Sequence, residues 1–190
     1  MSSKAPPKNI ATRSVRAGIE SDAHHGSVVP PIYLSTNFAF ESFRQPRRYD
    51  YTRSGNPTRD QLAQALTDLE GGAGAVVTCT GLAAITLILA TLPQGARVLA
   101  PHDCYGGTYR LLAALQGQGK LVVDFVDQTD AAALQAALAA KPKLVWIETP
   151  SNPLLRVVDI RAITEAAHAV DALAVVDNTF LSPIDRKSVV

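Results

Sequence analysis

The stretch LVWIETPSNPLLRVVDI, residues 144–160, contains three structural signals in a row. It opens with the apolar run LVWI, whose length is typical of a strand that is buried on both faces. Glu148 follows, then a loop with Pro150, Asn152 and Pro153, and the next helix is expected from Ile160 onward. A buried strand, a short loop and a helix are the components of a βαβ unit, so this stretch predicts an α/β protein.

The same alternation continues on both sides of this stretch. Besides 144–147, short apolar runs predict strands at 75–78, 98–100, 121–126 and 173–176. Helices are expected between them, at 82–91, 107–116, 131–140 and 160–169. Apolar strands separated by helices form a largely parallel sheet with helices on both faces. We therefore expect a doubly wound, mostly parallel sheet flanked by helices.

Residues 1–56 differ in composition from the rest of the chain. They are rich in Pro, Ser, Asn and Arg and show no sustained hydrophobic period. Paired prolines remove backbone donors, so residues 27–40 can be extended without belonging to a continuous sheet. A free segment of this kind would expose several large apolar side chains, namely Ile32, Tyr33, Leu34, Phe38, Phe40 and Phe43. We interpret residues 1–56 as an extended N-terminal arm that a partner subunit covers.

A helix is expected directly after the arm. Asn56 suits the N-cap and Pro57 the first helical position. Apolar side chains then recur at helical spacing until Gly71 and Gly72 end the pattern. The predicted domain division is therefore an arm at 1–56 and an α/β domain at 57–190.

Composition and charge narrow the classes of protein. The 190 residues include 18 basic and 17 acidic side chains, a net charge of +1, which favours neither a nucleic acid nor a membrane as partner. The two cysteines, Cys79 and Cys104, are too few for a disulfide framework and indicate a reduced, cytoplasmic protein. The N-terminus lacks the apolar core of a signal peptide, and no apolar run approaches the length of about 20 residues that spans a bilayer. We expect no metal site.

Polar residues follow four of the expected strands, at the edge where parallel sheets bind ligands. Gly81 and Leu82 open a helix and can direct backbone N–H groups at an anion, although many such glycines are only tight turns. Tyr105 could stack on a flat ring or be buried in a polar loop. Asn152 lies in a rigid loop that could also be a simple turn. Asp177, with Thr179 after it, could face a cationic nitrogen, cap a helix or form a salt bridge.

One ligand would use all four strand ends. An anion site, an aromatic side chain, an amide and a carboxylate together suit a flat, phosphorylated, nitrogen-containing ring, and pyridoxal 5′-phosphate fits that description. A dinucleotide fits less well because the chain has no G-x-G-x-x-G.

Five segments carry a resemblance to a known family: YDYTRSGNPTRDQLAQALTDLEGG, TGLAAI, APHDCYGGTYRLL, KPKLVWIETPSNPLLRVVDI and VVDNTFLSP. The chain resembles the Cys/Met-metabolism family of pyridoxal-phosphate enzymes of fold type I, from about Arg13 to Pro183. The resemblance implies that residues 57–190 are part of a pyridoxal-phosphate-binding large domain of the PLP-dependent transferase type, with its C-terminal part missing. It also implies a homotetramer built as a dimer of dimers.

The resemblance assigns roles by position. Tyr51 and Arg53 would reach the cofactor phosphate of a neighbouring subunit, whereas Gly81 and Leu82 would bind the phosphate within their own subunit. Tyr105 would stack on the pyridine ring and act as a catalytic residue by helping to deprotonate the substrate amine.

The same resemblance assigns the remaining site residues. Asn152 would lie near the ring oxygen, Asp177 would pair with the ring nitrogen, and Thr179 would lie beneath the ring. A buried carboxylate raises the pKa of an adjacent nitrogen base, so Asp177 would keep the ring protonated and electron-withdrawing. Arg110 and Ser54 would face the substrate.

Within the family, the segments are most similar to the cystathionine γ-synthase branch, with the γ-lyases second. A γ-synthase replaces the γ-substituent of an O-acylated homoserine by cysteine to give cystathionine, a step of methionine biosynthesis. Ser54 is a departure, because some γ-synthases have a second arginine there and γ-lyases have serine.

A second departure is the missing Schiff-base lysine. The family has it roughly 25 residues after the aspartate, whereas Lys187 is ten residues after Asp177 and lacks the flanking hydroxyls. The sequence therefore leaves two interpretations open. The chain is the N-terminal half of a transsulfuration enzyme, or it is a truncated, non-catalytic fragment that acts through cofactor or subunit binding. A nucleotide-binding domain is less favoured. We expect the 190-residue chain alone to be inactive.

Overall fold

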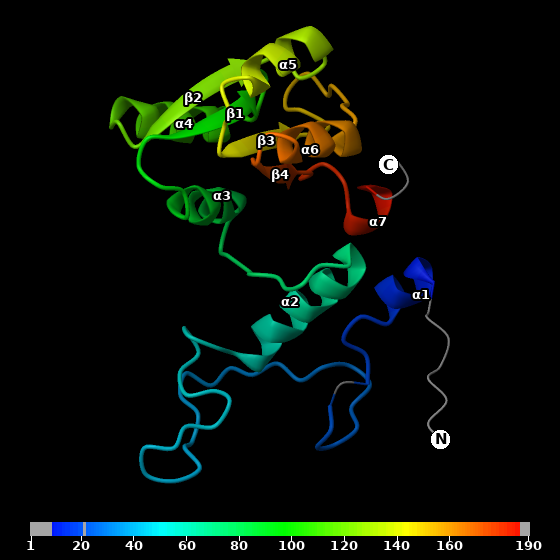
Figure 1. Ribbon diagram of the computed structural model, residues 1–190. Helices are drawn as coiled ribbons and strands as arrows, with labels where there is room; N and C mark the ends of the chain where they lie inside the picture. Colours follow the sequence, from blue (N-terminus) through cyan, green and yellow to red (C-terminus); the bar gives the residue numbers. More distant parts are fainter. Residues whose placement is uncertain (1–8, 21, 187–190) are drawn as a thin grey trace. The chain divides into compact units, whose positions relative to one another are not determined.

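The computed structural model describes residues 9–20 and 22–186. In chain order the elements are α1 (Ile10–Val15), α2 (Pro57–Glu70), α3 (Gly81–Ala90), β1 (Ala96–Pro101), α4 (Gly106–Gly117), β2 (Leu121–Val126), α5 (Ala131–Leu138), β3 (Leu144–Glu148), α6 (Ile160–His168), β4 (Leu173–Asp177) and α7 (Pro183–Arg186) (Figure 1). The chain divides into two compact units, one up to Val77 and one from Thr78. No helix among the described residues is long and apolar enough to cross a membrane.

The described part of the second unit is built around a parallel sheet of four strands in the order β2-β1-β3-β4. β1 pairs with β2 along its whole length, from Ala96 opposite Leu121 onward. β3 pairs with β4 up to their last residues, so that Glu148 lies opposite Asp177. Because all four strands run in the same direction, their carboxyl ends meet at one edge of the sheet.

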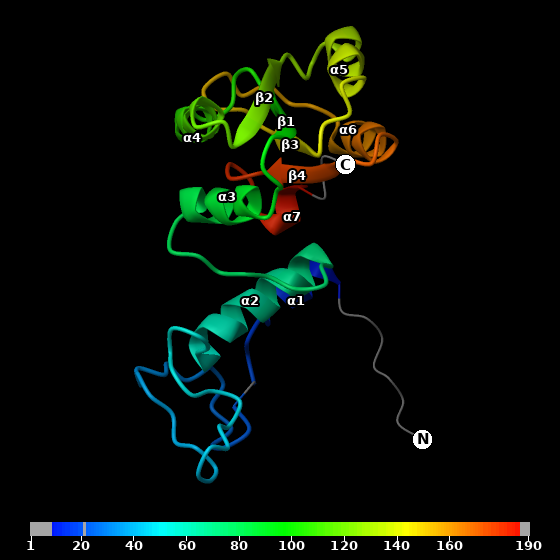
Figure 2. The same ribbon diagram turned by 60° about the vertical axis from the view of Figure 1, so that its left-hand side comes forward.

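Helices cover both faces of this sheet (Figure 2). On one face, side chains of α3 and α4 pack against alternate residues of the strands, with Ile85, Leu112 and Trp146 among the buried residues. On the other face, α5 and α6 pack through Leu134 and Ile163. Alternate side chains of a strand point to opposite faces, so mainly apolar strands such as β3 supply residues to both cores. The predicted fold class, a mostly parallel sheet flanked by helices, is confirmed.

The first unit contains α1, α2 and, between them, a long segment of turns and loops without a helix or strand among its described residues. The side chain of Asn56 accepts the N–H of Thr58 and caps α2, and Gly71, with φ of 67°, ends it in the left-handed region where glycine is unstrained. Residues 28–40 show only an isolated bridge between Asn37 and Tyr51. Of the six apolar arm residues, five are exposed, while Phe38 is partly buried and packs against Tyr49 with ring centroids 5.5 Å apart.

Two local predictions were wrong or incomplete. Residues 75–78 form no strand, because a strand requires a hydrogen-bonded neighbour and none lies beside them in the described chain; Val76 is 76% exposed. The arm also contains α1, a single short helix whose N-cap Asn9 accepts the N–H of Thr12. The other predicted strands and helices occur within two residues of their expected bounds. The proposed division at residue 56 stays a prediction.

Candidate active site

A cavity of about 450 Å³ opens at the carboxyl edge of the sheet in the second unit. Its lining includes seven of the residues predicted from the sequence, namely Gly81, Leu82, Tyr105, Arg110, Asn152, Asp177 and Thr179. Volumes of this size are typical of sites for small molecules and cofactors. The structure therefore brings the residues predicted after three strands, and those at the start of α3, to one hollow.

The N-terminus of α3 forms one wall of the cavity. The hydroxyl of Thr80 accepts the N–H of Ala83 at 3.1 Å and caps the helix. Within the described part of the chain, no hydrogen bond uses the N–H groups of Gly81 or Leu82. A Cβ at Gly81 would meet no atom within 4 Å, so the backbone is open to a ligand. Free N–H groups at a helix start, together with the helix dipole, attract an anion such as a phosphate.

Tyr105 lies at the start of α4 on another side of the cavity. Its side chain is 48% exposed, so the alternative of a buried tyrosine is wrong. The ring lies close to the backbone of Gly107, where an added Cβ would be 2.4 Å from Cε1 of Tyr105. Gly107 is therefore required for a close approach, a role that the sequence analysis missed because nothing local distinguishes it from a turn glycine.

Asp177 ends β4 and is partly buried. Its Oδ1 accepts the N–H of Thr179 at 3.2 Å and the Thr179 hydroxyl at 2.5 Å. No ion pair in the described residues includes Asp177, so the alternative of a salt bridge is not observed. The neighbouring Asn178 donates from Nδ2 to the carbonyl of Thr149, which ties this strand end to the loop after β3.

Glu148, the last residue of β3, also lines the cavity and was not predicted as a site residue. It is 5% exposed, and burial raises its pKa, although hydrogen bonds from the N–H groups of Tyr105 and Asn152 oppose the shift. Cys104 is buried beside it, and burial followed by the charge of Glu148 raises the pKa of this thiol to about 12. The signal that could have identified Glu148 is its place at the end of a wholly apolar strand.

Arg110 is the one positively charged side chain that lines this cavity among the described residues. It extends from α4, and an atom of its guanidinium lies 3.3 Å from where a Cβ on Gly106 would be. An arginine is suited to a carboxylate because its planar fork can donate two parallel hydrogen bonds.

Tyr51, Arg53 and Ser54 lie in the first unit, on one turn. The guanidinium of Arg53 stacks over the ring of Tyr51, 5.0 Å from its centroid, and the Ser54 hydroxyl lies 3.0 Å from Oδ1 of Asp50 and 2.8 Å from the carbonyl oxygen of Tyr51. The predicted role of Tyr51 and Arg53 at a neighbouring subunit's phosphate stays a prediction, as does the contact of Ser54 with substrate.

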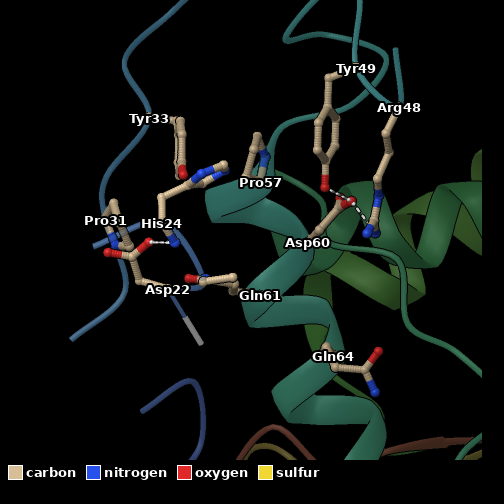
Figure 3. A pocket seen from close by; sticks show the side chains of 11 residues that line it. Asp22, His24, Pro31, Tyr33, Arg48, Tyr49, Pro57, Asp60, Gln61 and Gln64 are labelled. Carbon is tan, nitrogen blue, oxygen red and sulfur yellow. Dashed lines mark hydrogen bonds and ion pairs between the residues drawn. The ribbon is translucent and has the colours of Figure 1, made fainter. Parts of the chain in front are cut away.

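A second hollow lies within the first unit, beside the start of α2 (Figure 3). Its charged groups already have partners: Asp60 accepts the hydroxyl of Tyr49 at 2.7 Å and pairs with Arg48 at 3.3 Å. Asp22 accepts the N–H of His24 and the hydroxyl of Ser27, and these bonds lower its pKa to about 2. None of the predicted site residues lines this hollow. Among the described residues, no group of three or more potential ligands could hold a metal ion.

The fold and the cavity define an α/β domain with a hollow suited to a small anionic ligand at the carboxyl edge of a parallel sheet. A family model described as Cys/Met metabolism PLP-dependent enzyme matches residues 11–189. The chain belongs to this family, whose members depend on pyridoxal phosphate.

Individual relatives carry several activities. The chain is 58% identical over 174 residues to cystathionine γ-synthase of Escherichia coli, which covers 91% of this chain and 45% of that protein. It is 40% identical over 175 residues to cystathionine β-lyase of Lactococcus lactis, covering 92% of this chain and 46% of the relative. The chain thus spans about half the length of the curated relatives it matches.

Solved structures give the same result. Cystathionine γ-synthase from Xanthomonas oryzae pv. oryzae in complex with cystathionine matches with a TM-score of 0.90 and 57% identity, covering 94% of this chain and 46% of that one. Cystathionine γ-lyase from Lactobacillus plantarum matches with a TM-score of 0.86 and 36% identity, covering 93% of this chain and 46% of that one.

The residues of the cavity fit the family's cofactor. The unused N–H groups of Gly81 and Leu82 suit its phosphate, and the ring of Tyr105 suits its pyridine. The carboxylate of Asp177 has a hydrogen-bonded Oδ1, whereas no hydrogen bond among the described residues uses its Oδ2. A carboxylate with an oxygen left for a cation suits the ring nitrogen.

Proposed function

We propose that the protein to which this chain belongs is a transsulfuration enzyme of the cystathionine γ-synthase type. It replaces the acyloxy group on Cγ of an O-acylated homoserine by the sulfur of cysteine. The Cγ–O bond breaks, the acyl group leaves as a carboxylate, the Cγ–S bond forms, and the thiol loses its proton. The 58% identity to the Escherichia coli γ-synthase supports this reaction over others of the family.

The single observation that carries the proposal is the shared cavity, in which an anion-binding helix start, an aromatic ring and a carboxylate face one space. The cofactor, when bound, withdraws electrons from the substrate carbon that loses its proton. The chain's own residues hold and orient it. Gly81 and Leu82 donate to the phosphate, Asp177 keeps a proton on the ring nitrogen, and Thr179 holds the Asp177 carboxylate in place.

Three other residues of the cavity act on the ring oxygen and on the substrate. Asn152 donates to the ring oxygen. Tyr105 stacks on the ring and accepts a proton from the substrate amine. Arg110, as the cation of the lining, binds a substrate carboxylate.

The arm completes the proposal. Tyr51 and Arg53 reach the phosphate in a neighbouring subunit of a homotetramer, and Ser54 faces the substrate there. The exposed apolar arm residues, such as Leu34 and Phe43, support cover by a partner subunit. The expected cytoplasmic location follows from the reduced cysteines, which are both free.

A γ-lyase, which breaks the Cγ–S bond of cystathionine, is the second candidate. Ser54 favours it, as does the 40% identity to cystathionine γ-lyase of Sus scrofa. The 190-residue chain by itself is proposed to be inactive. Of the lysines that the structure describes, Lys120, Lys141 and Lys143, none lines the cavity, and Lys187 lies outside the described residues.

A chimera tests the reaction. The segment of the Escherichia coli γ-synthase that matches this chain is replaced by the chain, and the purified, cofactor-loaded protein receives cysteine with O-succinylhomoserine or O-acetylhomoserine. We expect cystathionine from at least one ester, and loss of most turnover with retained cofactor in Asp177→Asn. A folded, loaded chimera that makes no cystathionine contradicts the synthase, and faster cleavage of cystathionine than its formation supports the lyase.

The chain alone is tested by reduction with borohydride in the presence of pyridoxal phosphate. We expect no lysine to be labelled stoichiometrically. A single, fully labelled lysine together with cystathionine formation would overturn the proposal that the chain alone is inactive.

A further inference from the structure

One buried carboxylate joins two loops of the cavity. Glu148 Oε1 and Oε2 lie 3.0 and 2.9 Å from the backbone nitrogen of Tyr105, and Oε1 also accepts the N–H of Asn152 at 2.9 Å. Glu148 is almost completely buried, and no ion pair in the described part of the chain includes it. Its recorded partners are backbone groups, which indicates that it fixes the course of the chain.

The first of these N–H groups belongs to the residue that precedes α4. In a capping box, a glutamate three residues into the helix binds the N–H of the N-cap residue. Here the N-cap is Tyr105, its side chain makes no cap bond, and the third helical residue is Thr108. Glu148 from β3 supplies the carboxylate instead, close to the positive end of the helix dipole.

The second N–H group belongs to the loop after β3. Asn152 lies between two prolines, Pro150 and Pro153, whose preceding peptide bonds are both cis. Proline has no N–H, and the N–H of Ser151 binds the carbonyl oxygen of Arg156, so the N–H of Asn152 is the donor that remains for the strand end. Through Glu148 it is held at the same carboxylate as Tyr105.

We propose that Glu148 is a positioning residue that sets the spacing of Tyr105 and Asn152 across the cavity. The inference rests on the proposed function, in which Tyr105 stacks on the pyridine ring and Asn152 lies at its ring oxygen. Neither side chain contacts Glu148 in a recorded hydrogen bond, so Glu148 acts through the two backbones. A ligand ring fits between them only at the spacing that Glu148 fixes.

Two substitutions separate the effect of the Glu148 charge from the effect of its side-chain length. Glu148→Gln keeps the length. Its carbonyl oxygen in the place of Oε1 can still accept both N–H groups, whereas its NH₂ in the place of Oε2 faces the N–H of Tyr105 and loses that bond. Glu148→Asp keeps the charge but is one methylene shorter, so it cannot reach both loops. Glu165→Gln, on an exposed position of α6, is the matched control.

Hydrogen exchange in the ligand-free, full 190-residue chain tests whether Glu148 holds the backbone N–H groups of Tyr105 and Asn152. We expect Glu148→Asp to speed the exchange of both amides, Tyr105 and Asn152, roughly tenfold to a hundredfold. Glu148→Gln should speed mainly the exchange of Tyr105, and Glu165→Gln should change neither. Pyridoxal phosphate affinity, measured by quenching of intrinsic fluorescence, should fall by a similar factor in the two Glu148 variants. Unchanged exchange at both amides overturns the proposal, and so does faster exchange with unaltered affinity.

The unsubstituted chain gives an independent readout should the variants not fold. The NMR chemical shifts of the Tyr105 and Asn152 amides should change with pH at one common midpoint. That midpoint should equal the one at which the chemical shift of the Glu148 carboxyl carbon changes. The charged or titratable groups around Glu148 are Asp103 and Cys104 from the loop after β1, Asp177 from β4, and Arg110 from α4. Two different midpoints overturn the proposal. If the cofactor-loaded chimera makes no cystathionine, the proposed function is contradicted instead, and the exchange and titration of the two amides still test the role of Glu148.

Discussion

Cys104 should react with thiol reagents far more slowly in the folded chain than in the unfolded chain. It is 6% exposed, and burial, followed by the charges of Glu148 and Asp103, raises its pKa from 9.0 to about 12. Thiols react as thiolates. At about pH 8, a thiol with a pKa of 9.0 is roughly one-tenth ionised, and one with a pKa of about 12 is ionised to about one part in 10,000.

The expected change in rate is smaller than this ratio, because a more basic thiolate is a better nucleophile. The thiolate fraction falls about 1,000-fold, and a Brønsted coefficient of about 0.4–0.5 recovers roughly 15- to 30-fold. Ionisation alone should therefore slow Cys104 by about 30- to 60-fold. Steric cover of the buried sulfur adds to this, so about 30-fold is the minimum.

The assay is a short pulse of iodoacetamide on the full chain, with and without urea, followed by mass spectrometry of the two cysteine peptides. Cys79 is exposed in the folded chain and is the internal control, because its rate should change little on unfolding. If Cys104 is labelled within about threefold of its unfolded rate while far-UV circular dichroism remains native, the electrostatic account of this edge of the sheet is wrong.

Two further predictions concern the same edge of the sheet. Gly107→Ala should displace the Tyr105 ring and weaken pyridoxal phosphate binding by roughly tenfold with little loss of stability, because the exposed ring can move; Gly117→Ala, where an added Cβ meets nothing within 4 Å, is the control for fluorescence titration. Thr129→Val should raise the low pKa of Asp127, about 2, because the Thr129 hydroxyl is its main cause. A carboxyl group whose pKa is lowered by folding stabilises the fold above its ordinary pKa of 3.8 and loses that contribution as the pH falls toward 2. The variant should therefore lose less stability than the unsubstituted chain on acidification. NMR of the Asp127 carboxyl carbon measures the pKa, and an unchanged pKa contradicts the role given to the Thr129 hydroxyl.

The sequence predicted the sheet because short, mainly apolar runs alternate with helical segments. A run such as LVWI, at residues 144–147, can be buried only between two layers, and the helices between such runs supply those layers. The order β2-β1-β3-β4 could not be predicted, because neighbours in a parallel sheet are set by crossover connections that leave no local pattern. Residues 75–78 were predicted as a strand but do not form one. They have the composition of a strand, but pairing depends on a neighbour elsewhere in the chain.

The candidate site was predictable where a side chain itself meets the ligand. Asp177 and Tyr105 were identified because a carboxylate or an aromatic ring at a strand end needs an explanation in its own right. Glu148 was not predicted as a site residue, although it also ends an apolar strand, because its partners are backbone N–H groups of other segments. Gly107 was not, because its role is the space it leaves for the Tyr105 ring. Backbone N–H groups are the same in every residue except proline, so a carboxylate that binds them has no complementary partner visible in the sequence.

The parallel sheet brings three carboxylates together, and their partners suggest which one is left for a ligand. Asp103 faces Arg156 at 3.8 Å and accepts a serine hydroxyl at 2.6 Å. Glu148 is occupied by two backbone N–H groups. Asp177 has only Thr179, on Oδ1, as a recorded side-chain partner among the described residues. Like charges at one edge repel unless each is compensated. Among the described residues Asp177 has neither an arginine, as Asp103 has, nor bonds on both oxygens, as Glu148 has, so it gains most from a cationic group in the cavity. The neighbours of Asp177 thus support its proposed pairing with the ring nitrogen independently of the family's pattern.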